Sequence, residues 1–137
     1  MEAMTRPLIL SLCLALAGAS ASCSGEDRAV VHVYRHRSFF GLASGAVYEV
    51  HDGERSLGLL EPGLCLRYEA EPGEHEFWAF REVRSAVRLH LEPGSETFLR
   101  GSWAMGVVES RPELFVVEPE EGRRELTRDV DRIVEID

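Results

Sequence analysis

The stretch Leu64–Phe80, LCLRYEAEPGEHEFWAF, decides the fold of this chain. Apolar and polar residues alternate in its first half, as they do in a β-strand that buries one face. Its second half carries large apolar residues on both faces, which is typical of a strand covered on both sides. The residues between the halves, Glu71 to Glu74 (EPGE), are those of a turn. We therefore predict a β-hairpin, in which the His75 ring bonds a carbonyl group of the turn.

Similar runs on either side of this stretch extend the β pattern. Strands are expected at 29–35, 46–60, 85–91, 96–103 and 113–118. Asp52-Gly53 lies between two short alternating runs, which is a strong hairpin signal. The residues expected to shape turns are Asp52, Gly53, Pro72, Gly73 and His75. Short strands separated by turns predict an all-β fold, a small antiparallel β-sandwich of immunoglobulin-like type, over residues 29–118.

Residues 119–137 are expected to form a tail after this domain. Pro119 suits the first turn of a helix, whereas Gly122 opposes one. The pattern therefore predicts a short C-terminal helix or an irregular tail. The last segment, 130–137, is expected to be an edge strand or a frayed end.

The composition limits the classes of partner. The chain has 137 residues, of which 24 are acidic and 15 are Arg, with no Lys and a net charge of −9. Its length suits one domain. Nucleic acid is excluded as a partner, because a chain with this excess of acidic residues repels the phosphate backbone, whose binding draws on Lys and Arg contacts.

Residues 1–22 are predicted to be a signal peptide. Arg6 precedes the apolar run Leu8–Ala19, and small residues follow it. The run is too short to span a hydrocarbon core of about 30 Å and has the length of a secretory signal. Export from the cytoplasm follows from this pattern.

Two kinds of processing are open at the end of the signal. The stretch Ser20 to Cys23 resembles the lipobox of bacterial lipoproteins, in which the Cys23 thiol is acylated, and residues 23–28 would then be a linker. Ser24 favours the periplasmic face of the outer membrane. In the alternative, cleavage before Ser22 leaves a soluble periplasmic or secreted protein with a disulfide between Cys23 and Cys65. We expect Cys23 to carry the lipid and Cys65 to stay unpaired, as a small sheltered hydrophobe.

The order of turns and strands also resembles the bacterial DUF2846 family, small exported proteins of unknown function that are often lipoproteins. The matching positions are Tyr34-Arg35, Ser38 to Gly41, Asp52-Gly53, Gly58-Leu59, Pro72 to His75 and Pro93 to Phe98. The likeness covers about residues 30 to 125. The Asp-Gly and Pro-Gly-x-His turns are also similar to those of PEGA domains, β modules of the cell envelope. These motifs imply a fold and not a chemistry.

No set of residues predicts catalysis, a metal or a cofactor. His32 and His36 would lie about 13 Å apart on one strand, too far to share an ion. The chain contains no HExxH, CxxC or G-x-S-x-G motif. The paired carboxylates at Glu120-Glu121 and at the 71–74 turn fit solvated positions. We therefore expect no enzyme.

The best candidate for a binding surface is a set of aromatic residues. Its members are Trp78, Phe80, Phe39, Phe40 and Trp103. Large aromatic residues in a small domain also serve to cover an open sheet face, and we expect that role first. The sequence thus predicts a non-catalytic cell-envelope lipoprotein module with an envelope protein or glycan as partner. The alternative is a module that binds glycan or peptidoglycan through the aromatic set.

Overall fold

The computed structural model describes residues 27–37, 47–80, 84–105 and 110–137. These residues form strands and one helix. In chain order the elements are β1 (Ala29–Arg35), β2 (Tyr48–Asp52), β3 (Arg55–Leu60), β4 (Leu64–Ala70), β5 (Gly73–Phe80), β6 (Arg84–Leu91), β7 (Glu96–Met105), β8 (Ser110–Val117), α1 (Pro119–Asp129) and β9 (Arg132–Ile136). The expected signal peptide, Cys23, Phe39 and Phe40 lie outside the described residues.

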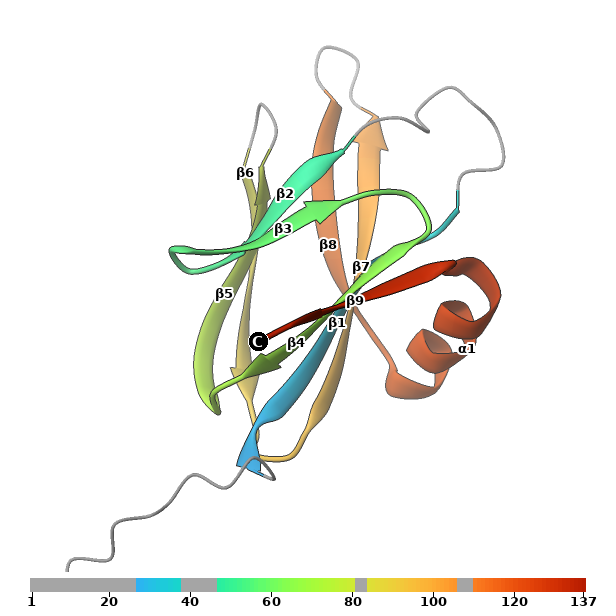
Figure 1. Ribbon diagram of the computed structural model, residues 1–137. Helices are drawn as coiled ribbons and strands as arrows, with labels where there is room; N and C mark the ends of the chain where they lie inside the picture. Colours follow the sequence, from blue (N-terminus) through green and yellow to red (C-terminus); the bar gives the residue numbers. More distant parts are fainter. Residues whose placement is uncertain (1–26, 38–46, 81–83, 106–109) are drawn as a thin grey trace, which may run out of the picture.

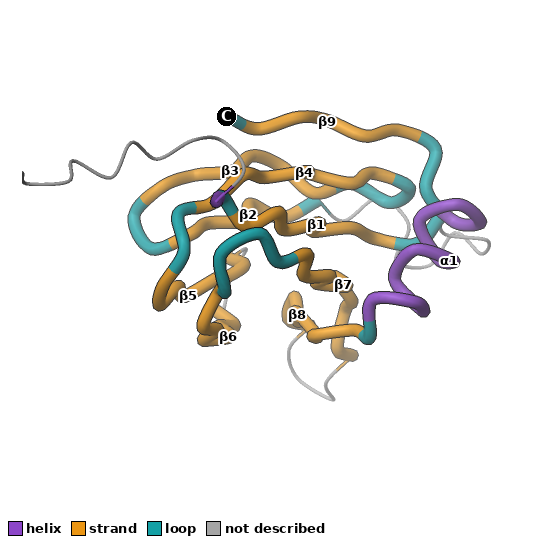
Figure 2. Tube along the Cα trace, turned by 90° about the horizontal axis from the view of Figure 1, so that it is seen from below, coloured by secondary structure: helices purple, strands orange, loops and turns teal. Residues whose placement is uncertain are grey.

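Two sheets face each other, so the prediction of an all-β sandwich is confirmed. The larger sheet has the strand order β8-β7-β1-β4-β9, and the smaller has the order β3-β2-β5-β6. Figure 1 shows the two layers, with α1 beside the larger sheet, and Figure 2 shows the same layers from below. Among the residues that the structure describes, no helix is both long and apolar enough to cross a membrane.

The predicted hairpin at 64–80 is wrong, although both of its strands exist. β4 pairs with β1 and β9, whereas β5 pairs with β2 and β6 in the other sheet. The 71–72 link therefore carries the chain across the sandwich. Alternation reveals which face of a strand is buried but does not reveal its hydrogen-bonded neighbour. Here the apolar faces of β4 and β5, with Tyr68 and Phe77, meet across the interior at a ring-centroid distance of 6.4 Å.

The second predicted hairpin is confirmed. β2 and β3 pair antiparallel, with Gly53 between them at φ +57°. The register of the pair shifts between Val50 and His51. The Asp-Gly signal succeeded because a two-residue turn fixes both the direction and the partner of the next strand.

The sandwich is not purely antiparallel as predicted. β1 pairs parallel with β7, and β4 pairs parallel with β9. Parallel neighbours need a long connection. Helix α1 supplies part of one, because it returns the chain from β8 to the far edge of the larger sheet, where β9 lies.

The C-terminal segment forms a short helix and an edge strand, as two of the predicted alternatives had it. α1 packs on the outer face of the larger sheet, where an added Cβ at Gly122 would lie 2.4 Å from the Phe98 ring. The glycine that opposed a helix by propensity is therefore required by the close approach of helix and sheet. β9 forms the edge of the same sheet, beside β4.

The buried side chains form two clusters. The larger one fills the space between the sheets and includes Val31, Tyr48, Phe77 and Leu99. The smaller one lies between the larger sheet and α1 and contains Tyr34, Cys65, Phe98 and Val117. The central strand β1 contributes to both clusters, so it is covered on both faces.

Cys65 belongs to the smaller cluster. Its side chain is fully buried, and it forms no disulfide within the part of the chain that the structure describes. Burial is the main cause that raises the pKa of the thiol to about 12. Such a thiol stays protonated and poorly nucleophilic near neutral pH.

We predict that Cys65 of the native protein resists alkylation by iodoacetamide at pH 8, because the thiol is buried and protonated. In denaturant it should react fully. Intact mass spectrometry before and after unfolding measures both states. A residue that stays unmodified in denaturant, until a reductant is added, would show a disulfide instead.

The Gly73 position provides a test of the crossover between the sheets. Gly73 has φ +122°, and the space around its missing Cβ is open within 4 Å. Gly73→Val should therefore lower the free energy of unfolding by about 1–3 kcal/mol through backbone strain alone. Gly73→Ala should cost less than Val. Equal thermal melts for the wild type and Gly73→Val would contradict this conformation.

Candidate functional site

The structure separates the aromatic residues that were expected to form one surface. Trp78 and Phe80 lie two positions apart on β5, on the outer face of the smaller sheet, and Phe80 is 46% exposed. Trp103 lies in β7 of the larger sheet, where its backbone pairs with Pro112. Two of the five proposed residues are thus neighbours, and a third lies in the other sheet.

Both faces of the Trp78 ring are in contact with other side chains. The His51 ring is stacked on it with centroids 4.0 Å apart and planes 4° apart. The Arg84 guanidinium carbon lies 4.3 Å from its centroid. These residues come from β2 and β6, the strands on either side of β5, so they cover opposite faces of the indole. The indole Nε1 donates a hydrogen bond of 2.7 Å to the Gly53 carbonyl.

Trp78 therefore stabilises the β2–β3 turn. A sugar ring stacks on an aromatic face that is open to solvent, and the Trp78 ring has no such face. The expectation that aromatic residues cover the sheet describes Trp78 better than a glycan platform does.

Two of the residues predicted to shape turns, Asp52 and His75, meet in a polar cluster. Asp52 receives a hydrogen bond of 3.0 Å from the Tyr68 hydroxyl of the larger sheet. His75 Nδ1 lies 2.8 Å from Asp52 Oδ2, and His75 Nε2 lies 2.6 Å from the Glu71 carbonyl oxygen. The expected bond between His75 and a turn carbonyl is present, but it fixes a crossover between sheets and not a hairpin.

This cluster is poorly suited to acid–base catalysis. A catalytic base needs a nitrogen or oxygen within reach of a substrate proton. Both nitrogens of His75 already face oxygen acceptors inside the protein, and the ring is mostly buried. The Asp52–His75 pair resembles two members of a catalytic triad, yet a backbone carbonyl occupies the place of the nucleophile.

A second polar cluster lies under α1, and the sequence reasoning missed it. The Glu125 side chain is 7% exposed, and its carboxylate accepts hydrogen bonds from the Tyr34 hydroxyl and, at 2.9 Å, from Arg100 Nη1. His36 Nε2 lies 3.0 Å from Glu125 Oε2. The available signal was the spacing of Gly122 and Glu125, which places both on one face of the helix.

The environment of Glu125 keeps it ionised. Burial acts to raise the pKa of its carboxyl, but the hydrogen bond from Tyr34 and the proximity of His36 and Arg100 outweigh burial, so the net pKa is lowered. Burial, and then the same contact with Glu125, raise the pKa of the Tyr34 hydroxyl. Glu125 is therefore a charged anchor that holds α1 on the sheet, since a buried carboxylate is stable only when it is paired.

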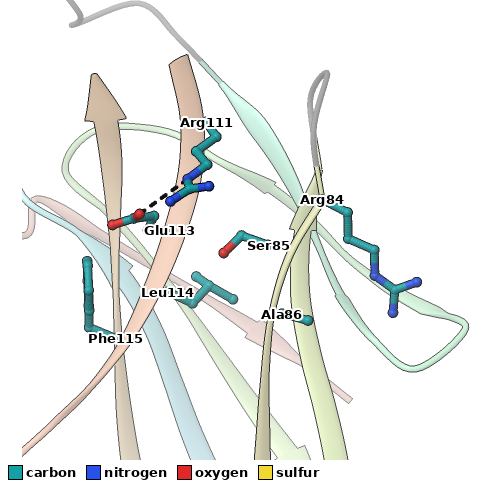
Figure 3. Close-up of a pocket in the computed structure, with 7 residues that line it drawn as sticks. All are labelled: Arg84, Ser85, Ala86, Arg111, Glu113, Leu114 and Phe115. Carbon is teal, nitrogen blue, oxygen red and sulfur yellow. Dashed lines mark ion pairs between the residues drawn. The ribbon is translucent and has the colours of Figure 1, made fainter. Parts of the chain in front are cut away.

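A hollow of about 410 Å³ lies between the edge strands β6 and β8. We call it the β6–β8 hollow, and its lining consists of Arg84, Ser85, Ala86, Arg111, Glu113, Leu114 and Phe115. Figure 3 shows Ser85 and Leu114 pointing into the space between the strands, with Arg84 on the outer side of β6. Arg111 Nε lies 3.4 Å from Glu113 Oε1. Sequence alternation gave no sign of this hollow, because it depends on which strands end each sheet.

Within the described ranges, no three His, Cys, Asp or Glu side chains come together as a metal-binding group. The polar side chains that do cluster are bonded to one another or to the backbone. The β6–β8 hollow is one place among the described residues where charged and apolar groups line a space large enough for a small ligand or a side chain.

We predict that Glu125→Gln lowers the free energy of unfolding by about 1–3 kcal/mol at pH 7, because a charged hydrogen-bond network loses its anion. The wild-type contribution exists above the pKa of unfolded glutamate, about 4.3, and disappears as the pH falls through the lowered folded pKa. Chemical denaturation between pH 7 and pH 3 should therefore show a smaller acid-induced loss for the variant. Parallel pH curves for the two proteins would contradict this role.

A scan against protein-family models, a search of curated proteins and a search of solved structures find no match to this chain. The resemblance to DUF2846 therefore continues to rest on the sequence motifs.

Proposed function

We propose that this chain is a non-catalytic, lipid-anchored β-sandwich module at the periplasmic face of the bacterial outer membrane, similar to the DUF2846 family. The observation that carries the proposal is the order of the N-terminal sequence. An apolar leader, small residues and Cys23 are followed closely by Ala29, where β1 begins. The intervening Ser24–Arg28 segment spans at most about 18 Å when extended, so the anchor would hold the sandwich near the membrane.

The non-catalytic part of the proposal is supported by the polar clusters. His75, Asp52 and Glu125 are the buried or half-buried groups most similar to catalytic residues, and each is bonded within the fold. Such bonds stabilise contacts between sheets and between α1 and the larger sheet.

The immunoglobulin-like type of sandwich is also part of the proposal. The two facing sheets and the crossover from β4 to β5 support it. The parallel pairs β1–β7 and β4–β9 depart from the fully antiparallel form of that type.

A glycan- or peptidoglycan-binding module remains the second candidate. The exposed Phe80 beside Trp78 favours it. Because both faces of Trp78 are covered, that function would depend on Phe80 and on residues outside the described ranges.

The lipid anchor can be tested in the native envelope. We expect the mature protein to partition into the detergent phase of Triton X-114, because the acyl chains of a modified Cys23 bury about 0.8 kcal/mol per CH₂ group. Intact mass should show acylation at Cys23. Cys23→Ser should move the protein to the aqueous phase, whereas the matched Cys65→Ala variant should stay in the detergent phase.

A different outcome would establish the soluble alternative. In that case the wild-type protein stays in the aqueous phase, begins at Ser22 and is two hydrogens lighter than its reduced form. Such a result would reject the lipid anchor without affecting the fold.

A further inference from the structure

The crossover from β4 to β5 is held by a polar cluster that joins the two sheets. The Tyr68 hydroxyl of the larger sheet donates a hydrogen bond of 3.0 Å to Asp52 of the smaller sheet. His75 lies near the start of β5, and its Nδ1 is 2.9 and 2.8 Å from the two carboxylate oxygens of Asp52. Its Nε2 is 2.6 Å from the Glu71 carbonyl oxygen, in the link between the strands. One imidazole ring therefore connects β2, β5 and the crossover.

The two groups that face the ring nitrogens of His75 are hydrogen-bond acceptors. A backbone carbonyl has no hydrogen to donate, and an ionised carboxylate has none either. A neutral imidazole has one N–H group and one bare nitrogen, so it satisfies only one of the two contacts. The other contact would then place two lone pairs against each other at hydrogen-bonding distance. Only a ring that is protonated on both nitrogens donates to the Asp52 carboxylate and to the Glu71 carbonyl together.

The surroundings of the ring also suit a cation. The Phe77 ring is stacked on His75 with centroids 5.8 Å apart, and the face of an aromatic ring attracts positive charge. Leu89 lies opposite His75 in the β5–β6 ladder, so β6 brings an apolar side chain to this position. The nearby carboxylates other than Asp52 have basic partners of their own. These pairs are Glu71 with Arg28, Glu74 with His90, and Glu76 with Arg84 and Arg88, while Arg55 lies 5.2 Å from the Tyr68 ring centroid.

We propose that His75 is an imidazolium in the folded protein and that the Asp52–His75 pair is a pH-sensitive link between the two sheets. The side chains of His75 and Asp52 are 14% and 10% exposed, so salt and water screen this ion pair little. When the pH rises and the ring releases a proton to solvent, one of its two contacts becomes repulsive and the crossover loosens. This inference goes beyond the lipid anchor and the absence of catalysis, and it rests on neither.

The link stabilises the fold at acidic pH and weakens as the pH rises. A histidine of the unfolded chain loses its second ring proton at about pH 6.5. The contribution of the pair is therefore complete below that pH and is lost as the folded protein releases the proton. Burial, and then the negative charge of Asp52, raise the pKa of Tyr68 above the usual range of a phenol. The Tyr68 hydroxyl thus keeps its hydrogen while His75 titrates.

The protonation of the ring can be tested by NMR of the full chain in detergent micelles, with the histidine ring nitrogens labelled with nitrogen-15. At pH 7 we expect both nitrogens of His75 to resonate as protonated nitrogens. Asp52→Asn removes the anion, so the ring should then show one bare nitrogen at the same pH. A bare nitrogen on His75 of the wild type, or a doubly protonated ring in Asp52→Asn, would overturn the proposal.

Thermal melts between pH 5.5 and pH 9 test the link separately. His75→Gln should lower the melting temperature by about 5 °C at pH 5.5, and the gap to the wild type should shrink toward pH 9. The matched control is His90→Gln, because His90 also lies beside two carboxylates, yet its side chain is 55% exposed. Its gap to the wild type should stay small at every pH. A constant gap for His75→Gln, or the same pH dependence for His90→Gln, would contradict the link. These outcomes do not depend on whether Cys23 carries a lipid, so they are separate from the detergent test.

Discussion

The structure depends on the burial of both faces of β1. This strand lies in the middle of the larger sheet, between β4 and β7. Val31 and Val33 point into the core between the sheets, while Tyr34 lies in the cluster under α1. A strand with two apolar faces needs two covers. The smaller sheet is one cover and α1 is the other, so the helix is part of the core even though it comes late in the chain.

This constraint explains why charged groups are buried where α1 meets the sheet. The helix has few apolar residues, and its contact with the sheet combines the packing of Gly122 on Phe98 with the bonds of Glu125. A single buried carboxylate with three partners fixes both the position and the rotation of the helix. A surface of leucines would hold the helix more loosely, because apolar contacts are not directional.

The sequence patterns predicted strands well and their partners poorly. Alternation located β4 and β5, and the Asp52-Gly53 turn correctly predicted the β2–β3 hairpin. The 71–74 turn looked similar, yet it joins two sheets, because a turn sequence fixes a local bend and not the strand that lies beside it. The partners of Glu125 and the β6–β8 hollow were beyond prediction for the same reason. Both depend on contacts between segments far apart in the chain, which no local pattern encodes.

The parallel strand pairs limit the order in which this protein can fold. Val30 at the start of β1 pairs with Glu96, and Leu64 at the start of β4 pairs with Arg132. Contacts between such distant segments carry a large entropic cost of loop closure before they contribute stability. When the chain emerges from its N-terminus, the central strand β1 is therefore present long before the segments that cover it. β9, the last strand that the structure describes, completes the larger sheet, so the edge of β4 is open to pairing with other chains until β9 is in place.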